Sequence, residues 1–200
     1  MKGDVTGAPR IIELNTQVVE LHDRGRFEEA LPVAHEATAL ARRHPGQHRL
    51  ELANSLANLG SVLMELGAYA DAEAAYGEAL KIHRESPVLM VWQLAMVLNS
   101  LGTLNETIAD YPGAEQLFRQ ARELLDKYLE PDDPDRTLPL NNLGRLYQAL
   151  GDYLAAERML QEALSIRERG HAPPIQVARS LNNLAELYRV TGRHGQAQPL

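Results

Sequence analysis

The stretch from Leu140 to Ala156 reads LNNLGRLYQALGDYLAA, and the rest of the chain repeats its pattern. Its first leucine has counterparts at steps of 42 residues toward the N-terminus and at one step of 41 toward the C-terminus. The five anchoring leucines are Leu14, Leu56, Leu98, Leu140 and Leu181. Eleven positions after the anchor stands glycine in four of the five registers, and sixteen positions after it stands alanine in all five. A fixed period of this size predicts a solenoid built from internal repeats.

Each repeat has the pattern of a helical hairpin. Within the quoted stretch, apolar residues recur at helical spacing as far as Leu150. Gly151 can then adopt the left-handed conformation that ends a helix, and Asp152 can cap the next one. From Tyr153 to about Ile166 the apolar residues again share one helical face. The repeat is therefore predicted to be two antiparallel helices joined by a tight turn.

The phrases LNNLGRLY at Leu140 and LNNLAELY at Leu181 resemble the tetratricopeptide repeat. The resemblance is to the 42-residue version found in kinesin light chains and in many bacterial multidomain proteins, and it extends from about Ile11 to Leu200. It implies an all-α fold, a right-handed superhelical α-solenoid of helix-turn-helix repeats. Residues 1–10 are expected to form a flexible tail and residues 11–200 the repeat array. The expected repeats span about 11–49, 50–86, 87–135, 136–173 and 174–200, the last one truncated.

The third repeat departs most from the pattern. Ala109 stands where the turn glycine is expected, and the first helix, expected to start at Pro87, is the most apolar of the chain. That helix contains Trp92, the only tryptophan. Two interpretations stay open: Trp92 packs between repeats two and three, or it forms an apolar ligand pocket with Met96.

Composition excludes several classes of protein. The chain has no cysteine, so disulfides, thiol nucleophiles and cysteine-ligated metals are ruled out. The net charge of -7 argues against nucleic-acid binding, and no apolar run is long enough to predict a membrane span. Residues 51–150 hold 7 basic against 15 acidic residues, whereas residues 151–200 hold 6 against 5. The composition favours a cytoplasmic protein whose C-terminal part is the least acidic.

The sequence contains no pattern typical of an enzyme or of a cofactor site. It has no glycine-rich phosphate loop and no His-Glu-x-x-His motif. His44 and His48 are four residues apart, but Pro45 and Gly46 between them break the helix that a paired metal site would need. We therefore expect no catalytic residues, no metal and no cofactor.

The resemblance places the residues one, two and five positions after each anchor on the concave groove of the solenoid. Every repeat supplies at least one asparagine there, and an amide can both donate to and accept from the backbone of an extended peptide. The alternative is that these amides bond to the neighbouring repeat. The candidate groove residues are Asn58, Asn99, Asn141, Asn142, Arg145, Arg179, Asn182, Asn183, Glu186 and Arg189.

A narrower hypothesis concerns the arginines of repeats four and five. Some tetratricopeptide domains bind a terminal carboxylate through lysines at the groove positions, and this sequence lacks those lysines. Arg145, Arg179 and Arg189, with Asn142 and Asn183, can instead form a subsite for an acidic side chain or a C-terminal carboxylate. Glu186 counts against it, and the alternative is that the arginines pair with local glutamates.

The expected function is non-enzymatic binding of a protein or peptide in the groove, as an interaction module of a larger cytoplasmic protein. Neither nucleic acid nor a membrane is an expected partner. The first alternative is self-association, because a truncated fifth repeat exposes an apolar face at the C-terminal end. The second is a regulatory or sensor arm of a bacterial multidomain effector whose catalytic domain lies outside this chain.

Overall fold

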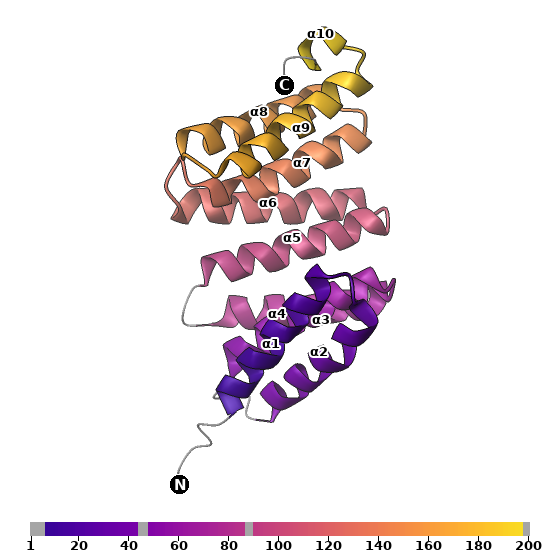
Figure 1. The fold of residues 1–200 in the computed structure, drawn as a ribbon, viewed down its shortest axis with the longest axis vertical. Helices are drawn as coiled ribbons and strands as arrows, with labels where there is room; N and C mark the ends of the chain where they lie inside the picture. Colours follow the sequence, from indigo (N-terminus) through magenta and orange to yellow (C-terminus); the bar gives the residue numbers. More distant parts are fainter. Residues whose placement is uncertain (1–6, 44–47, 87–89, 198–200) are drawn as a thin grey trace. The chain divides into compact units, whose positions relative to one another are not determined.

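The computed structural model describes residues 7–43, 48–86 and 90–197, and nearly all of them are helical. The first four helices are α1 (Gly7–Asp23), α2 (Phe27–Arg42), α3 (Arg49–Glu65) and α4 (Tyr69–Glu85). They are followed by α5 (Val91–Thr107), α6 (Tyr111–Tyr128) and a short 3-10 helix, η1 (Pro134–Arg136). The last four are α7 (Thr137–Ala149), α8 (Tyr153–Arg169), α9 (Pro174–Val190) and α10 (His194–Ala197). Consecutive helices pack as hairpins within the two units of the chain: α1 with α2, α3 with α4, α7 with α8, and α9 with α10 (Figure 1).

The chain folds into two compact units, residues 1–104 and 105–200. The first contains α1 to α4 and most of α5. The second contains the last residues of α5 and everything after them. In the second unit, α8 contacts both α7 and α9, and the three helices lie side by side (Figure 1).

The turn inside each hairpin is the same in all five repeats. Gly25, Gly67, Gly151 and Gly192 all have a positive φ between 69° and 78°. In the fourth hairpin the amide of Gly151 donates to the carbonyl of Gln148 and that of Asp152 to the carbonyl of Tyr147. This pair of bonds is the Schellman arrangement that ends a helix on a left-handed residue.

Ala109 keeps this turn without the glycine. Its φ is 65°, and its amide and that of Asp110 make the same two hydrogen bonds, to Glu106 and Asn105. The departure seen in the sequence therefore does not change the turn, which keeps the same φ region and the same hydrogen bonds. A side chain in this conformation costs about 1 kcal/mol more than glycine.

The cores of the second unit form where the apolar faces of successive helices meet. One cluster joins α6 to α7 and consists of Ala114, Phe118, Leu143 and Leu146. Another joins α8 to α9 and consists of Ala156, Leu160, Leu184, Leu187 and Tyr188. Gly144 lies directly against Leu160, since a β-carbon at Gly144 would come within 2.7 Å of that side chain. The small residue predicted at this position thus allows α7 and α8 to approach closely.

Three details differ from what the sequence suggested. Helix α1 begins at Gly7, inside the segment expected to be a flexible tail, because Gly7 and Ile11 are buried. The expected helix start at Pro87 lies outside the described residues, and α5 begins at Val91. Trp92 is 41% exposed, so it is not a fully buried core residue, and it lines a pocket of about 330 Å³ with Met96 and His83. That this pocket binds a ligand stays a prediction.

His83 makes the stability of the first unit sensitive to pH. This residue is 3% exposed, neither ring nitrogen has a hydrogen-bond partner among the described residues, and burial lowers the pKa of His83 below its ordinary value of 6.5. The unfolded chain therefore binds a proton more readily than the folded one as pH falls through 6.5. The free energy of unfolding is expected to decrease between pH 7 and pH 5, measured by urea denaturation at each pH.

The variant His83→Leu should show a weaker pH dependence over this range, because leucine cannot be protonated. Leucine fits the repeat, since Leu125 occupies the equivalent position and is fully buried. The exposed His35 supplies the control, His35→Leu, whose pH dependence should match that of the unchanged protein. Equal pH dependence in all three proteins would contradict the assignment.

Candidate functional site

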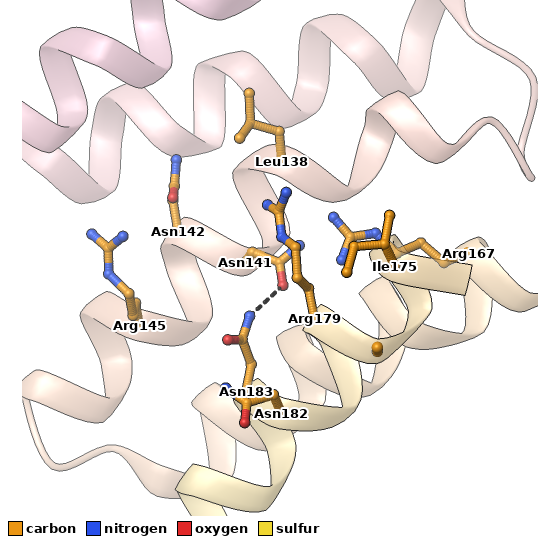
Figure 2. Close-up of a pocket in the computed structure, with 10 residues that line it drawn as sticks. Leu138, Asn141, Asn142, Arg145, Arg167, Ile175, Arg179, Asn182 and Asn183 are labelled. Carbon is orange, nitrogen blue, oxygen red and sulfur yellow. Dashed lines mark hydrogen bonds between the residues drawn. The ribbon is translucent and has the colours of Figure 1, made fainter. Parts of the chain in front are cut away.

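A pocket of about 420 Å³ opens between α7 and α9 in the second unit. We call it the α7–α9 pocket. Its lining consists of Leu138, Asn141, Asn142, Arg145, Arg167, Ile175, Ala178, Arg179, Asn182 and Asn183. Figure 2 shows polar side chains of α7 and α9 facing one another across it, with Arg167 reaching in from α8. No carboxylate is among the lining residues described.

Helical spacing explains why these side chains share one face. Asn141 and Arg145 are four residues apart in α7, as are Ile175 and Arg179 in α9. The apolar residues of the same helices, such as Leu143 and Leu184, point the other way and are buried in the cores. The core contacts therefore fix which polar residues the two helices present.

Some of the asparagines at the predicted groove positions link neighbouring repeats. The side-chain amide of Asn183 donates to Asn141 Oδ1 at 3.0 Å, and Asn58 donates to Asn15 Oδ1 at 3.1 Å (Figure 2 shows the first pair). The two bonds are equivalent in the repeat. In each, the donor stands two residues after its anchoring leucine, and the acceptor stands one residue after the anchoring leucine of the preceding repeat. These amides thus bond to the neighbouring repeat, as the alternative interpretation predicted, although each donor keeps a second N–H for a ligand.

The other predicted asparagines divide into exposed and buried ones. Asn182 is exposed and makes no hydrogen bond to a described residue. Asn142 is half-buried and lines the pocket. Asn99 is only 4% exposed and donates to the carbonyl of Ala95 within its own helix. Asn99 therefore does not face an open groove.

Two of the three arginines in the predicted anion subsite have carboxylate partners. Arg145 pairs with Glu106 at 2.6 Å, and Arg189 pairs with Glu186 one turn away at 2.6 Å. The hydrogen bonds that Arg189 donates lower the pKa of the Glu186 carboxyl group. Glu186 and Arg189 lie outside the α7–α9 pocket and form a local ion pair, as the alternative hypothesis predicted.

Sequence reasoning missed the most buried charge of the pocket, Arg167. Arg167 is 5% exposed, and its guanidinium donates to Thr137 Oγ1 at 3.1 Å, to Ser180 Oγ at 2.7 Å and to the carbonyl of Gln176 at 2.8 Å. It thereby joins α7, α8 and α9. All three acceptors are neutral, and burial, followed by the nearby charge of Arg179, lowers the pKa of Arg167.

A signal for Arg167 was present in the sequence. It follows Leu160 by seven residues and Ala163 by four, so it lies on the apolar face of α8. The equivalent residues of other repeats are Ala41, His83 and Leu125. An arginine on an apolar helix face is rare unless it serves a specific partner, because burying an unpaired charge is costly.

Arg179 is the second arginine of the pocket without a carboxylate partner. It is exposed on α9 and makes neither a hydrogen bond nor an ion pair with any residue that the structure describes. Its side chain extends from α9 toward α7, and in the view of Figure 2 it lies between Asn142 and Arg167. The pocket therefore concentrates positive charge that the surrounding described residues do not neutralise.

The described residues offer neither a metal-binding cluster nor a membrane-spanning helix. Within residues 7–43, 48–86 and 90–197, no cluster of three or more histidine, aspartate and glutamate side chains is arranged to bind a metal ion. Within the same ranges, no helix has both the length and the apolar character needed to cross a membrane.

Comparison with known proteins identifies the family. The tetratricopeptide repeat family matches residues 18–85 and 93–169, which is most of the chain. No curated protein matches the sequence. The chain belongs to the tetratricopeptide repeat family, and the all-α repeat fold predicted from the sequence is confirmed.

Solved structures show the same fold at low sequence identity. BtubC (BKLC) from P. vanneervenii has a TM-score of 0.76 and 22% identity, with 98% of this chain and 88% of that chain covered. A kinesin light chain candidate from Podosopora anserina with nearly identical TPR-like repeats has a TM-score of 0.75 and 19% identity, with 95% and 90% covered. The apo form of RapI has a TM-score of 0.74 and 17% identity, with 98% and 53% covered. The expected likeness to kinesin-light-chain repeats is thus confirmed, and the family typically supplies non-enzymatic interaction scaffolds.

Proposed function

We propose that this chain is a non-enzymatic peptide-binding module and that the face formed by α7 and α9 holds an extended segment of its protein partner. The observation that supports this most is the α7–α9 pocket, where six of the ten residues predicted from the sequence lie together. These six are Asn141, Asn142, Arg145, Arg179, Asn182 and Asn183.

The chemistry of the pocket suits a polypeptide ligand. The amides of Asn182 and Asn183 offer donors and acceptors that match the backbone of an extended peptide. Ile175 is 70% exposed at the rim and offers an apolar contact for a ligand side chain. The arginines add a preference for negative charge. The cytoplasmic setting expected from the composition remains a prediction.

The proposal is tested by selecting peptides from a random display library on the unchanged protein and measuring their affinity by fluorescence polarisation. The exposed Ala178 lines the pocket, so Ala178→Trp should fill it without disturbing a core. We expect this substitution to weaken peptide binding roughly tenfold or more, because the peptide loses both space and hydrogen bonds.

The matched control is Ala74→Trp, at an exposed position of α4 that lies in the other unit. It should leave peptide affinity unchanged. Circular dichroism should show the same helicity for all three proteins. Selected peptides that bind Ala178→Trp as tightly as the unchanged protein would place the binding surface elsewhere and contradict the proposal.

A further inference from the structure

Arg167 and Arg179 bring two positive charges into one pocket without a carboxylate of their own. Neither arginine forms an ion pair with a residue in the described parts of the chain, and their charges act on each other, since Arg179 lowers the pKa of Arg167. A buried, uncompensated guanidinium is destabilising for the folded chain. A ligand that supplies negative charge at this point would therefore gain from both arginines.

The hydrogen bonds of Arg167 leave a defined part of its guanidinium for such a ligand. Nε and Nη1 donate to Thr137, Ser180 and Gln176. Nη2 donates to no acceptor among the described residues, and Arg167 lines the pocket. The three bonds hold the guanidinium in place, so an anion bound to Nη2 would meet a donor that is already oriented.

The charge of the anion follows from the number of uncompensated arginines. Arg145 is balanced by Glu106, whereas Arg167 and Arg179 are not balanced. A carboxylate carries one negative charge. A phosphate monoester carries about 1.5 to 2 negative charges near pH 7 and has three strong acceptor oxygens, so it matches two arginines better. The nearby amide of Asn182 can donate to an oxygen that the arginines leave open.

A second arginine-rich pocket differs from the α7–α9 pocket because it contains its own carboxylates. It has a volume of about 430 Å³ and is lined by Arg119, Arg122 and Arg158, but also by Glu123 and Asp126. Arg119 pairs with Glu115 at 2.7 Å, and Arg122 pairs with Glu162 at 2.8 Å. That pocket neutralises most of its own charge, so it has less need of an external anion.

We infer that the α7–α9 pocket is a subsite for a phosphate monoester, held by Arg167 and Arg179 and carried by a phosphorylated side chain of the bound peptide. This inference rests on the proposed peptide-binding function for the source of the phosphate. It does not rest on that function for the binding of phosphate itself. The two are therefore tested separately.

The first experiment uses inorganic phosphate alone as the probe. Thermal unfolding of the full chain is followed in sodium phosphate and in sodium chloride of equal ionic strength, because a ligand that binds only the folded state raises the unfolding temperature. The unchanged protein should be stabilised by phosphate beyond the effect of chloride. Arg179→Gln should weaken phosphate binding roughly tenfold or more, since it removes a charged donor from an exposed position.

Two further variants complete this comparison. Arg167→Met keeps most of the side-chain volume and removes the charge, and it should also abolish the phosphate effect. Arg189→Gln removes an arginine of the same helix that lies outside the pocket, and it should behave like the unchanged protein. If Arg167→Met does not fold, Arg179→Gln alone decides. No specific effect of phosphate on the unchanged protein, or an equal effect on Arg179→Gln, would overturn the inference.

The second experiment identifies the source of the phosphate. A peptide selected on the unchanged protein is resynthesised with phosphoserine, glutamate or serine at each position in turn. We expect one position at which phosphoserine binds roughly tenfold or more tightly than serine, with glutamate between them, and at which Arg179→Gln removes the gain. Peptides that bind equally well with and without phosphate would overturn the subsite and leave peptide binding standing. Stabilisation by phosphate without any peptide binding would instead contradict the proposed function and retain the anion site.

Discussion

Replacing Gly170 with alanine is expected to destabilise the second unit by about 2–3 kcal/mol, as overpacking of a close contact does. Gly170 follows the last residue of α8, and a β-carbon there would lie 2.0 Å from the carbonyl oxygen of Asp132. That neighbour is backbone, so it cannot move aside as a flexible side chain can. The segment is also held by Arg169, whose Nε donates to Asp132 Oδ1 at 2.7 Å. The free energy of unfolding from urea denaturation measures the effect.

The matched control for this prediction is Gly77→Ala. Gly77 lies within α4, is exposed, and has no atom within 4 Å of the position of an added β-carbon. Alanine there should stabilise the chain by about 0.5–1 kcal/mol, because glycine loses more conformational entropy in a helix. If Gly170→Ala were also neutral or stabilising, the close approach of the two segments would be refuted.

Replacing Phe118 with alanine is expected to cost about 3–5 kcal/mol of stability. Phe118 is fully buried in α6, in the cluster with Ala114, Leu143 and Leu146 that joins α6 to α7. Its removal leaves a cavity at the contact between consecutive repeats, and such contacts supply much of the stability of a repeat array. Urea denaturation followed by circular dichroism should show the change as an earlier unfolding transition.

The only other phenylalanine provides the comparison. Phe27 is half-buried at the start of α2, and its ring packs at a steep angle against that of His22 with a centroid distance of 5.2 Å. Phe27→Ala should cost less than half as much as Phe118→Ala, because less apolar surface is lost from the interior. Similar losses for the two variants would show that the contact between α6 and α7 is not the stabilising feature inferred here.

The hairpins followed from the sequence because they depend on local signals that recur. The glycines at the turn and the alanine sixteen positions after each anchor repeat in register, so each hairpin supports the interpretation of the next. Ala109 shows that this register can outweigh a single residue, since the third turn keeps its left-handed conformation without glycine. Helix starts such as Gly7 were less predictable, because they depend on burial by residues distant in sequence.

The candidate site followed from the sequence only in part. Helical spacing was enough to place Asn141 and Arg145 on one face of α7, and the resemblance to the tetratricopeptide repeat predicted that Asn182 lies on the equivalent face of α9. It could not show that Arg145 pairs with Glu106 or that Asn99 is buried, since both depend on contacts between helices. Spacing along one helix says nothing about which side chain of another helix lies opposite.

The sequence by itself determined the repeat, its period, the hairpin turns and the face on which the polar residues lie, because these are periodic and local. The tertiary structure decided which charges are compensated. Arg189 has a carboxylate partner one turn away, Arg145 has one 39 residues earlier, and Arg167 meets only neutral acceptors from α7 and α9. The charge of the pocket is a sum over side chains from several helices, and that sum is defined only once the helices are packed.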